Sequence, residues 1–125
     1  CIDHITDAQF VEEVPYSIGS IRNHMVHLTG VDERWLARLN GSPVPNALQY
    51  ADFATRAVTR ARWEQAAQAM SGYVGSLQNS QLDEIWQILL HVVNHGTDHR
   101  AQILPVLHRL GAPTLEQDFM IYLWE

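Results

Sequence analysis

The stretch HVVNHGTDHRAQ, residues 91–102, places His91, His95 and His99 at intervals of four residues within the apolar spacing of a core helix. Residues four apart lie on one face of a helix, about 5–6 Å apart at Cβ. That spacing lets two imidazoles hold one metal ion, as in other motifs with histidines at i and i+4. The stretch therefore predicts a helix that carries part of a metal site, with a further ligand from elsewhere in the chain.

The helical period indicates which of these histidines face a neighbouring helix. At about 100° per residue, His99 lies about 60° from the centre of the apolar face, His95 about 100° and His91 about 140°. His95 and His99 therefore flank the core side, whereas His91 points most nearly away. We expect His95 and His99 to be the pair that binds the ion.

A third ligand could come from the helix predicted over residues 17–39, which contains His24 and His27. Periodicity places His24 nearer the apolar stripe, but the more lateral His27 suits a site at the flank of the core as well. The residues alone leave both open. A metal ion with three histidine ligands and one open coordination position is typical of a catalytic site, in which the ion acts on water or a thiolate. Imidazole ligands suit zinc, copper, iron and nickel alike.

Composition narrows the class of protein. The chain has 125 residues, enough for one domain with one core, and a formal charge of −6. All eight basic residues are arginine, and no basic stripe is present, which argues against nucleic acid as a partner. The single cysteine, Cys1, excludes a disulfide framework and a thiolate metal site. Without a signal peptide or an apolar run long enough for a bilayer, we expect a cytoplasmic protein with no membrane partner.

The remaining pattern is helical throughout. Thr6 and Gln9 form a capping box that predicts a short helix to about Val14, before Pro15. The helix that follows is expected to begin at Ser17 as N-cap and to run to about Leu39, where Asn40 and Gly41 stop it. No segment shows convincing strand alternation, so the fold class is all-α.

Two further helices are predicted in the second half. Asp52 or Thr55 caps one that runs to about Leu77, with Val58 and Val74 on its buried side. After a short connection, an antiparallel helix runs from about Leu82 to Leu110 and continues through Pro105. The tail, residues 115–125, is expected to pack back on the bundle.

Two segments carry a resemblance to a known family. HLTGVDERWL, residues 27–36, followed by HVVNHGTDHRAQ, residues 91–102, resembles the DinB/YfiT-like family. That family's first motif has a histidine, an apolar residue and then an acidic-x-Trp-Leu run, and its second is HVVNHGTxHRGQ. Residues 6–10 and 16–18 also match the family's approach to its second helix, so the resemblance covers most of the chain.

The resemblance implies an up-down-down-up four-helix bundle with a divalent metal ion, zinc or nickel, held by His27, His95 and His99. It thereby selects His27 over His24. It also implies a homodimer that acts on a small-molecule substrate, either as a thiol-dependent transferase with a low-molecular-weight thiol or as a metal-dependent hydrolase.

The chain departs from the family pattern in two places. Ala101 replaces the usual glycine after His-Arg. The family's first long helix is expected before Cys1, so residues 1–125 are interpreted as a single DinB-like domain shortened at its N-terminus. Without that helix, one apolar side of the second and fourth helices would be uncovered. We therefore expect further N-terminal residues in the native protein or a partner chain on that side.

Three functions follow from these observations. The first is a metalloenzyme whose general base is unidentified, with Asp98, Asp32 and Glu33 near the ligands in sequence. The second is a non-catalytic helical dimerisation module with a structural or adventitious ion, and the third is a metal-free, pH-sensitive histidine patch. Arg100 could hold an anionic substrate or form an ion pair, and Tyr16 and Trp35 could line a pocket or belong to the core. His4 and His108 are expected at the surface.

Overall fold

The structure, a computed structural model, describes residues 1–115, and within that range it contains helices and no strand. The elements are the 3₁₀ turns η1 (Ile2–His4) and η2 (Tyr50–Asp52) and the helices α1 (Asp7–Val11), α2 (Ile21–Leu39), α3 (Arg56–Gly75) and α4 (Asn79–Arg109). The predicted all-α class is therefore confirmed. Of the C-terminal tail that was expected to pack on the bundle, residues 116–125 lie outside the described range, and Leu115 is 70% exposed. None of the described helices has the length and apolar character needed to span a membrane.

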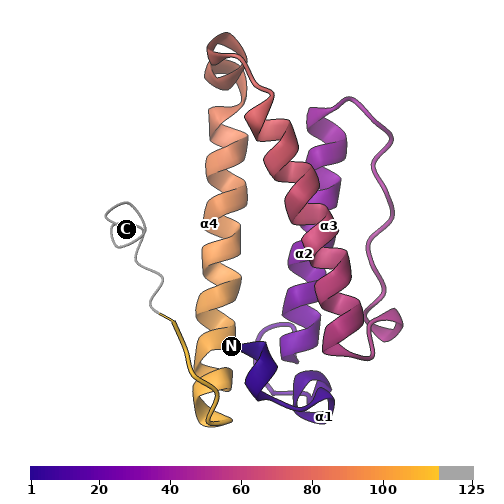
Figure 1. The fold of residues 1–125 in the computed structure, drawn as a ribbon, viewed down its shortest axis with the longest axis vertical. Helices are drawn as coiled ribbons and strands as arrows, with labels where there is room; N and C mark the ends of the chain where they lie inside the picture. The colour runs from indigo at the N-terminus through magenta and orange to yellow at the C-terminus, as the bar shows by residue number, and fades with distance from the viewer. Residues whose placement is uncertain (116–125) are drawn as a thin grey trace.

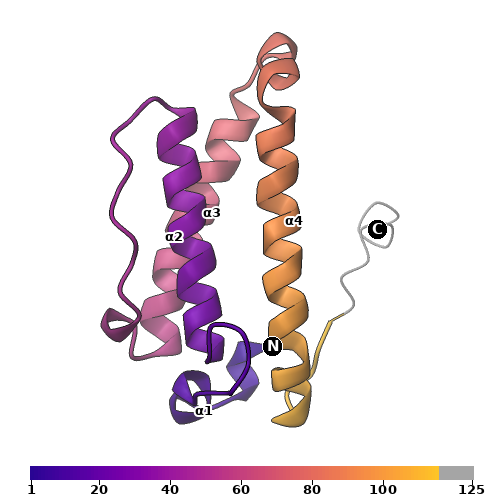
Figure 2. The same ribbon diagram turned by 180° about the vertical axis from the view of Figure 1, so that it is seen from behind.

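The three long helices have the directions expected for the last three helices of the predicted bundle. α2 and α3 run the same way, because the loop over residues 40–55 returns along the molecule to the end where α1 lies (Figure 1). α4 runs in the opposite direction, and the view from behind shows it beside α2 (Figure 2). α2 packs against both α3 and α4, whereas α3 and α4 make few contacts with each other within the described residues.

The N-terminal capping box is confirmed, but α1 is shorter than predicted. The backbone N–H of Gln9 donates to Thr6 Oγ1 at 3.2 Å, and the Thr6 N–H donates to Gln9 Oε1 at 2.8 Å. The helix ends at Val11 because Glu12 is extended, with φ −60° and ψ 123°. Pro15 keeps the residue before it out of the helical region, so the chain leaves the helix ahead of this proline.

The predicted N-cap of α2 at Ser17 is wrong. Ser17 has a φ of 54°, in the left-handed region, and Gly19 has a φ of 93°, so residues 15–19 form a turn. Ser20 is the N-cap instead, and its Oγ accepts from the Asn23 N–H at 3.2 Å. The Asn23 side chain donates to the Ile18 carbonyl at 2.8 Å, which fixes the turn against the first turn of the helix.

This assignment predicts different effects for two neighbouring serines. Ser20→Ala removes a fully buried N-cap acceptor and should lower the free energy of unfolding by about 1 kcal/mol. Ser17→Ala removes an exposed hydroxyl outside the helix and should change it by less than about 0.5 kcal/mol. Urea denaturation of both variants checks the pair. A larger loss for the Ser17 variant would contradict the observed cap.

The bounds of the two later helices differ modestly from the expected ones. Thr55, rather than Asp52, caps α3, because its Oγ1 accepts from the Val58 N–H at 3.3 Å. α4 begins three residues before the predicted Leu82, where the Gln81 side chain accepts from the Gln78 N–H at 2.9 Å. The helix continues through Pro105 to Arg109, as predicted.

The predicted buried face of α3 is wrong. Val58 and Val74 are 50% and 41% exposed, whereas Thr59 and Ala66 are 1% and 6% exposed. α3 packs mainly on α2 and carries small or apolar residues around its whole circumference. The helical period therefore defines no single buried side from the sequence of this helix.

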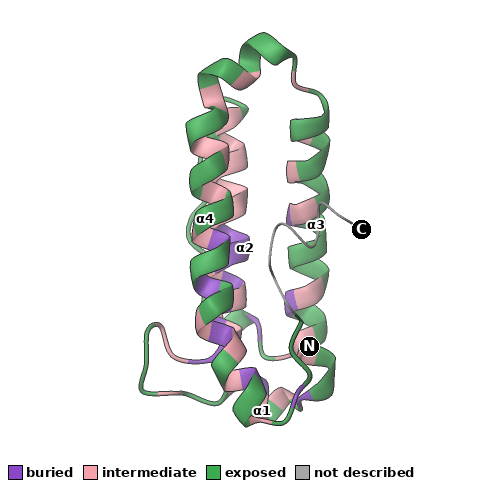
Figure 3. Cartoon of the chain, turned by 90° about the vertical axis from the view of Figure 1, so that its left-hand side faces the viewer, coloured by how far each residue is buried: buried purple, intermediate pink, exposed green. Residues whose placement is uncertain are grey.

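The hydrophobic core lies at the end of the molecule that contains α1. Figure 3 shows the buried residues concentrated in that half of α2 and α4. The core joins the N-terminal segment, the start of α2 and the end of α4 through Ile5, Phe10, Ile21, Ile103, Leu107 and Ala112. This packing fixes the two helices side by side, so that their central turns face each other just beyond the core.

Beyond that point, α4 carries an uncovered row of large apolar side chains. Trp86, Leu90 and Val93 are 52%, 59% and 63% exposed. Their spacing of four and then three residues places them on one face of the helix. We call these three residues the α4 stripe.

Candidate metal centre

Four histidines meet where the central turns of α2 and α4 face each other. The ring centroids of His27 and His95 are 5.3 Å apart, those of His27 and His99 4.8 Å, and those of His95 and His99 4.6 Å. One ring nitrogen from each of these three lies within 4.8 Å of the other two, and no carboxylate or thiol of the described residues joins the group. The structure thus brings together the three histidines that the resemblance implied.

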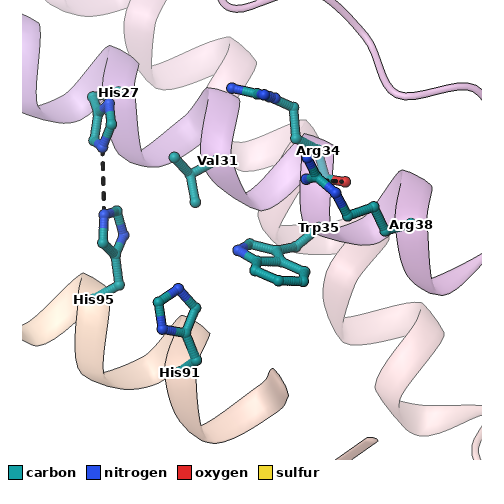
Figure 4. Close-up of a pocket in the computed structure, with 7 residues that line it drawn as sticks. All are labelled: His27, Val31, Arg34, Trp35, Arg38, His91 and His95. Carbon is teal, nitrogen blue, oxygen red and sulfur yellow. Dashed lines mark hydrogen bonds between the residues drawn. The ribbon is translucent and has the colours of Figure 1, made fainter. Parts of the chain in front are cut away.

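The spacing of these rings suits a single metal ion. Nε2 of His27 lies 3.4 Å from Nε2 of His95. A dashed line joins these two rings in Figure 4. Zinc binds imidazole nitrogen at about 2.0–2.1 Å, and tetrahedral geometry then separates two ligand nitrogens by about 3.4 Å. The pair already has the separation that one ion requires. His27 and His95 could therefore bind one ion together, and His99, with a ring nitrogen within 4.8 Å of the other two, could supply the third ligand.

The helical period predicted the relative burial of the α4 histidines correctly. His99 is 8% exposed, His95 is half-buried and His91 is exposed. The His91 ring lies 6.0 Å from that of His95 and 5.5 Å from Trp35, outside the group of three. His4 and His108, expected at the surface, are exposed.

His24 has a position that the sequence did not reveal. Its side chain is 3% exposed, and its Nδ1 lies 2.8 Å from Nδ1 of His99. When the Nδ1–H of a neutral His99 donates to Nδ1 of His24, the proton is on Nδ1 of His99, and its Nε2 keeps the lone pair that can bind an ion. Groups that hydrogen-bond a metal-binding histidine fix its tautomer and its orientation. The position of His24 nearer the apolar stripe was the one signal in the sequence for this role.

Loss of the His24 contact should weaken metal binding without removing any of the three nitrogens. We expect His24→Phe, which keeps a buried ring but offers no acceptor, to lower zinc affinity by about 10- to 100-fold. His24→Gln restores an acceptor and should recover part of that loss. Zinc titration against a competing chromophoric chelator measures both. Equal affinity in His24→Phe and the parent would contradict the assigned role.

Burial favours the neutral form of all four histidines. It is the main cause of the lowered pKa values of His24, His27, His95 and His99, and for His99 the pKa falls to about 4. The positive charges of neighbouring histidines lower these pKa values further, while Asp98 raises the pKa of His24, His95 and His99. Neutral imidazole is the form that binds metals, so the group is prepared for an ion at neutral pH.

The lowered pKa of His99 makes the metal-free protein sensitive to acid. In the unfolded chain the pKa of a histidine is about 6.5, so the unfolded state takes up a proton first as the pH falls. Stability is therefore full above about pH 6.5 and is lost as the pH falls towards 4, by about 2 kcal/mol at pH 4.5. Denaturation of chelator-treated protein between pH 7.5 and 4.5 checks this. In His99→Gln the free energy of unfolding should depend less steeply on pH than in the parent, whereas in His108→Gln the dependence should be unchanged.

The carboxylates near the ligands in sequence do not meet the histidines. Glu33 accepts two hydrogen bonds from Arg62, at 2.6 and 3.1 Å, and so joins α2 to α3. Asp98 is exposed and accepts from the Gln102 side chain at 3.1 Å. Burial raises the pKa of Asp32 to about 6, although the positive charge of Arg100 acts in the other direction and lowers it. The Arg100 guanidinium itself donates to Thr97 Oγ1 at 2.9 Å.

An open groove of about 450 Å³ begins at the histidines and follows α2 away from the core. We call it the histidine groove. Trp35 lines it, whereas Tyr16 is 63% exposed and borders a separate cavity near Pro105. The lining of the histidine groove comes from α2, with His27, Val31, Arg34, Trp35 and Arg38, and from α4, with His91 and His95 (Figure 4).

The chain also matches a known protein family. The family model described as DinB family matches residues 1–125. The chain belongs to the DinB family. A search of curated proteins found no match. In this DinB-family chain, both motifs that carried the resemblance lie on the two helices that form the histidine group, the first on α2 and the second on α4.

Proposed function

We propose that this DinB-family chain is a metal-dependent enzyme in which His27, His95 and His99 bind one divalent ion, zinc or nickel. The observation that carries the proposal is a group of three histidines, two of which, His27 and His95, line one end of an open groove, with no fourth ligand in the group among the described residues. A structural zinc site is normally closed by a fourth protein ligand, whereas a catalytic site keeps a position for water or substrate. The groove thus favours an enzyme over a non-catalytic module.

In the proposed enzyme, residues of this chain orient the metal ligands and the substrate. An ion bound by the three histidines would act as a Lewis acid, which favours deprotonation of a water or thiol at the open position. His24 holds His99 in one orientation through the Nδ1–Nδ1 contact. Trp35 and His91 form a wall that limits where a substrate can lie. Water would make the enzyme a hydrolase, and a low-molecular-weight thiol would make it an S-transferase.

The size of the groove and the charge of the chain support a small-molecule substrate. The groove volume of about 450 Å³ falls within the range of about 300–1,000 Å³ that holds small ligands. The net charge of −6 opposes binding to nucleic acid.

We also propose that a second copy of the chain covers the α4 stripe. Exposed apolar residues gathered on one helical face often mark a contact with another protein. Light scattering should give twice the chain mass for the parent and a smaller mass for the double variant Leu90→Gln, Val93→Thr. A parent that stays monomeric at high concentration would contradict this arrangement.

Activity assays test the enzymatic proposal. Metal-free, zinc-loaded and nickel-loaded protein would be assayed for thiol transfer to 1-chloro-2,4-dinitrobenzene and for hydrolysis of p-nitrophenyl esters. We expect at least one activity to follow metal content and to fall at least about 100-fold in His95→Ala but not in His108→Ala. A fully loaded parent that is no faster than the His95 variant in both reactions would contradict the proposal.

A further inference from the structure

We propose that the histidine groove selects an anionic substrate, whose negative group pairs with Arg38 while its other end reaches His27, His95 and His99. This inference rests on the proposed function and adds the chemical class of the substrate. It follows from the charge of the groove, the placement of Arg38 and the character of the wall between Arg38 and the histidines.

The charge of the groove is opposite to that of the protein. The chain has 14 acidic and eight basic residues, yet the groove is lined by two arginines and by no carboxylate. An anion entering this groove therefore meets positive charge at the surface of an otherwise acidic molecule, which favours its binding over that of a neutral molecule.

Arg38, rather than Arg34, is placed to receive the anion. Its Cζ lies 5.2 Å from the centre of the Trp35 ring, and its Nη1 donates to the Arg34 carbonyl at 3.3 Å. Stacking of a guanidinium on an indole fixes its plane, and the remaining N–H donors can pair with a carboxylate or phosphate in the bidentate manner. Figure 4 shows the Arg34 side chain extending away from Trp35.

The distance between Arg38 and the histidines sets the length of the substrate. Because Arg38 contacts the Arg34 carbonyl, its guanidinium lies near the level of Arg34. Arg34 is seven residues beyond His27, which corresponds to about 10 Å along the helix axis. A small anion such as acetate is too short to reach both ends.

The wall between the two ends is aromatic and apolar. The His91 ring meets the Trp35 ring edge to face, with centroids 5.5 Å apart, and Val31 lies beside them in the groove. Such a surface favours a flat or hydrocarbon segment over a strongly hydrated one. The expected substrate is therefore an elongated acid with a carboxylate or phosphate at one end, an apolar middle and the reacting group at the other.

Thiol probes of matched length test this class. 6-Mercaptohexanoate and 6-mercaptohexyl phosphate carry an anion at the far end, whereas 6-mercaptohexanol does not, and each thiol can bind a zinc ion. By calorimetry on the zinc-loaded protein, we expect at least one anionic probe to bind about tenfold more tightly than the alcohol. The tighter of the two anions distinguishes a carboxylate substrate from a phosphate substrate. 3-Mercaptopropionate should gain no such advantage over 3-mercaptopropanol, because it cannot span the groove.

Substitutions at Arg38 identify the source of the preference. Arg38→Gln should abolish the preference for the anion while leaving zinc content unchanged, and Arg38→Lys should keep part of it through its charge. Arg109→Gln, an exposed arginine at the far end of α4, is the matched control and should keep all of it.

Two outcomes would overturn the inference in distinguishable ways. Equal binding of the anionic and neutral probes to a zinc-loaded parent, or an unchanged preference in Arg38→Gln, rejects the anionic substrate and leaves the metal site in place. A parent that takes up no zinc by elemental analysis rejects the metal site and, with it, this inference.

Discussion

Replacing His95 by alanine is expected to remove stoichiometric metal from the protein while leaving the helical bundle intact. Loss of a residue that merely hydrogen-bonds a ligand costs about 10- to 100-fold in metal affinity, so loss of a ligand itself should cost at least 100-fold. His95 is half-buried at the edge of the groove, and the core lies nearer the other end of α2 and α4. Its loss should therefore leave the helical content unchanged.

Alanine variants of the other histidines are expected to differ in whether they keep the metal ion. His27→Ala and His99→Ala should lose the ion to the same degree as His95→Ala. His91→Ala should retain it, because the His91 ring contacts Trp35 and lies outside the group of three. Elemental analysis of untagged protein, never exposed to a nickel column, measures the stoichiometry. Loss of the ion in the His91 variant but not in the His27 variant would assign the site to a different set.

Metal binding should also raise the thermal stability of the protein substantially. His27 and His95 are 68 residues apart in sequence, so the unfolded chain does not hold the three ligands together. A ligand that binds only the folded state at 1,000 times its dissociation constant stabilises it by about 4 kcal/mol. For a domain of this size, the midpoint of unfolding should rise on the order of 10 °C.

Calorimetry of zinc-loaded and chelator-treated protein measures this shift. His108→Ala, which alters an exposed histidine on the same helix, should show the same shift as the parent, and His95→Ala should show almost none. A midpoint that is independent of zinc in the parent would show that the ion does not bind to the folded state selectively.

The sequence predicted those features that depend on local pattern. The Thr6 capping box, the end of α2 at Leu39 and the passage of α4 through Pro105 follow from short-range signals, and the structure confirms them. The order of burial of His99, His95 and His91 follows from the helical period alone.

Features that depend on contacts between distant segments could not be predicted in the same way. Ser17 and Ser20 are equivalent as capping residues in sequence, and the left-handed backbone at Ser17 distinguishes them only in the folded chain. The buried side of α3 depends on where α2 lies, since its own apolar residues surround it. The choice of His27 came from the family resemblance, and the contact of His24 with His99 joins residues 75 apart in sequence.

In the proposed site, three histidines bind one ion and leave a position open to the groove. X-ray absorption at the zinc edge, on protein loaded with one equivalent of zinc, tests it most directly because it counts imidazole ligands around the ion. We expect three imidazoles at about 2.0–2.1 Å with one further oxygen ligand from water. Four imidazoles would indicate a closed, structural site, and fewer than three would show that His27, His95 and His99 do not bind zinc together.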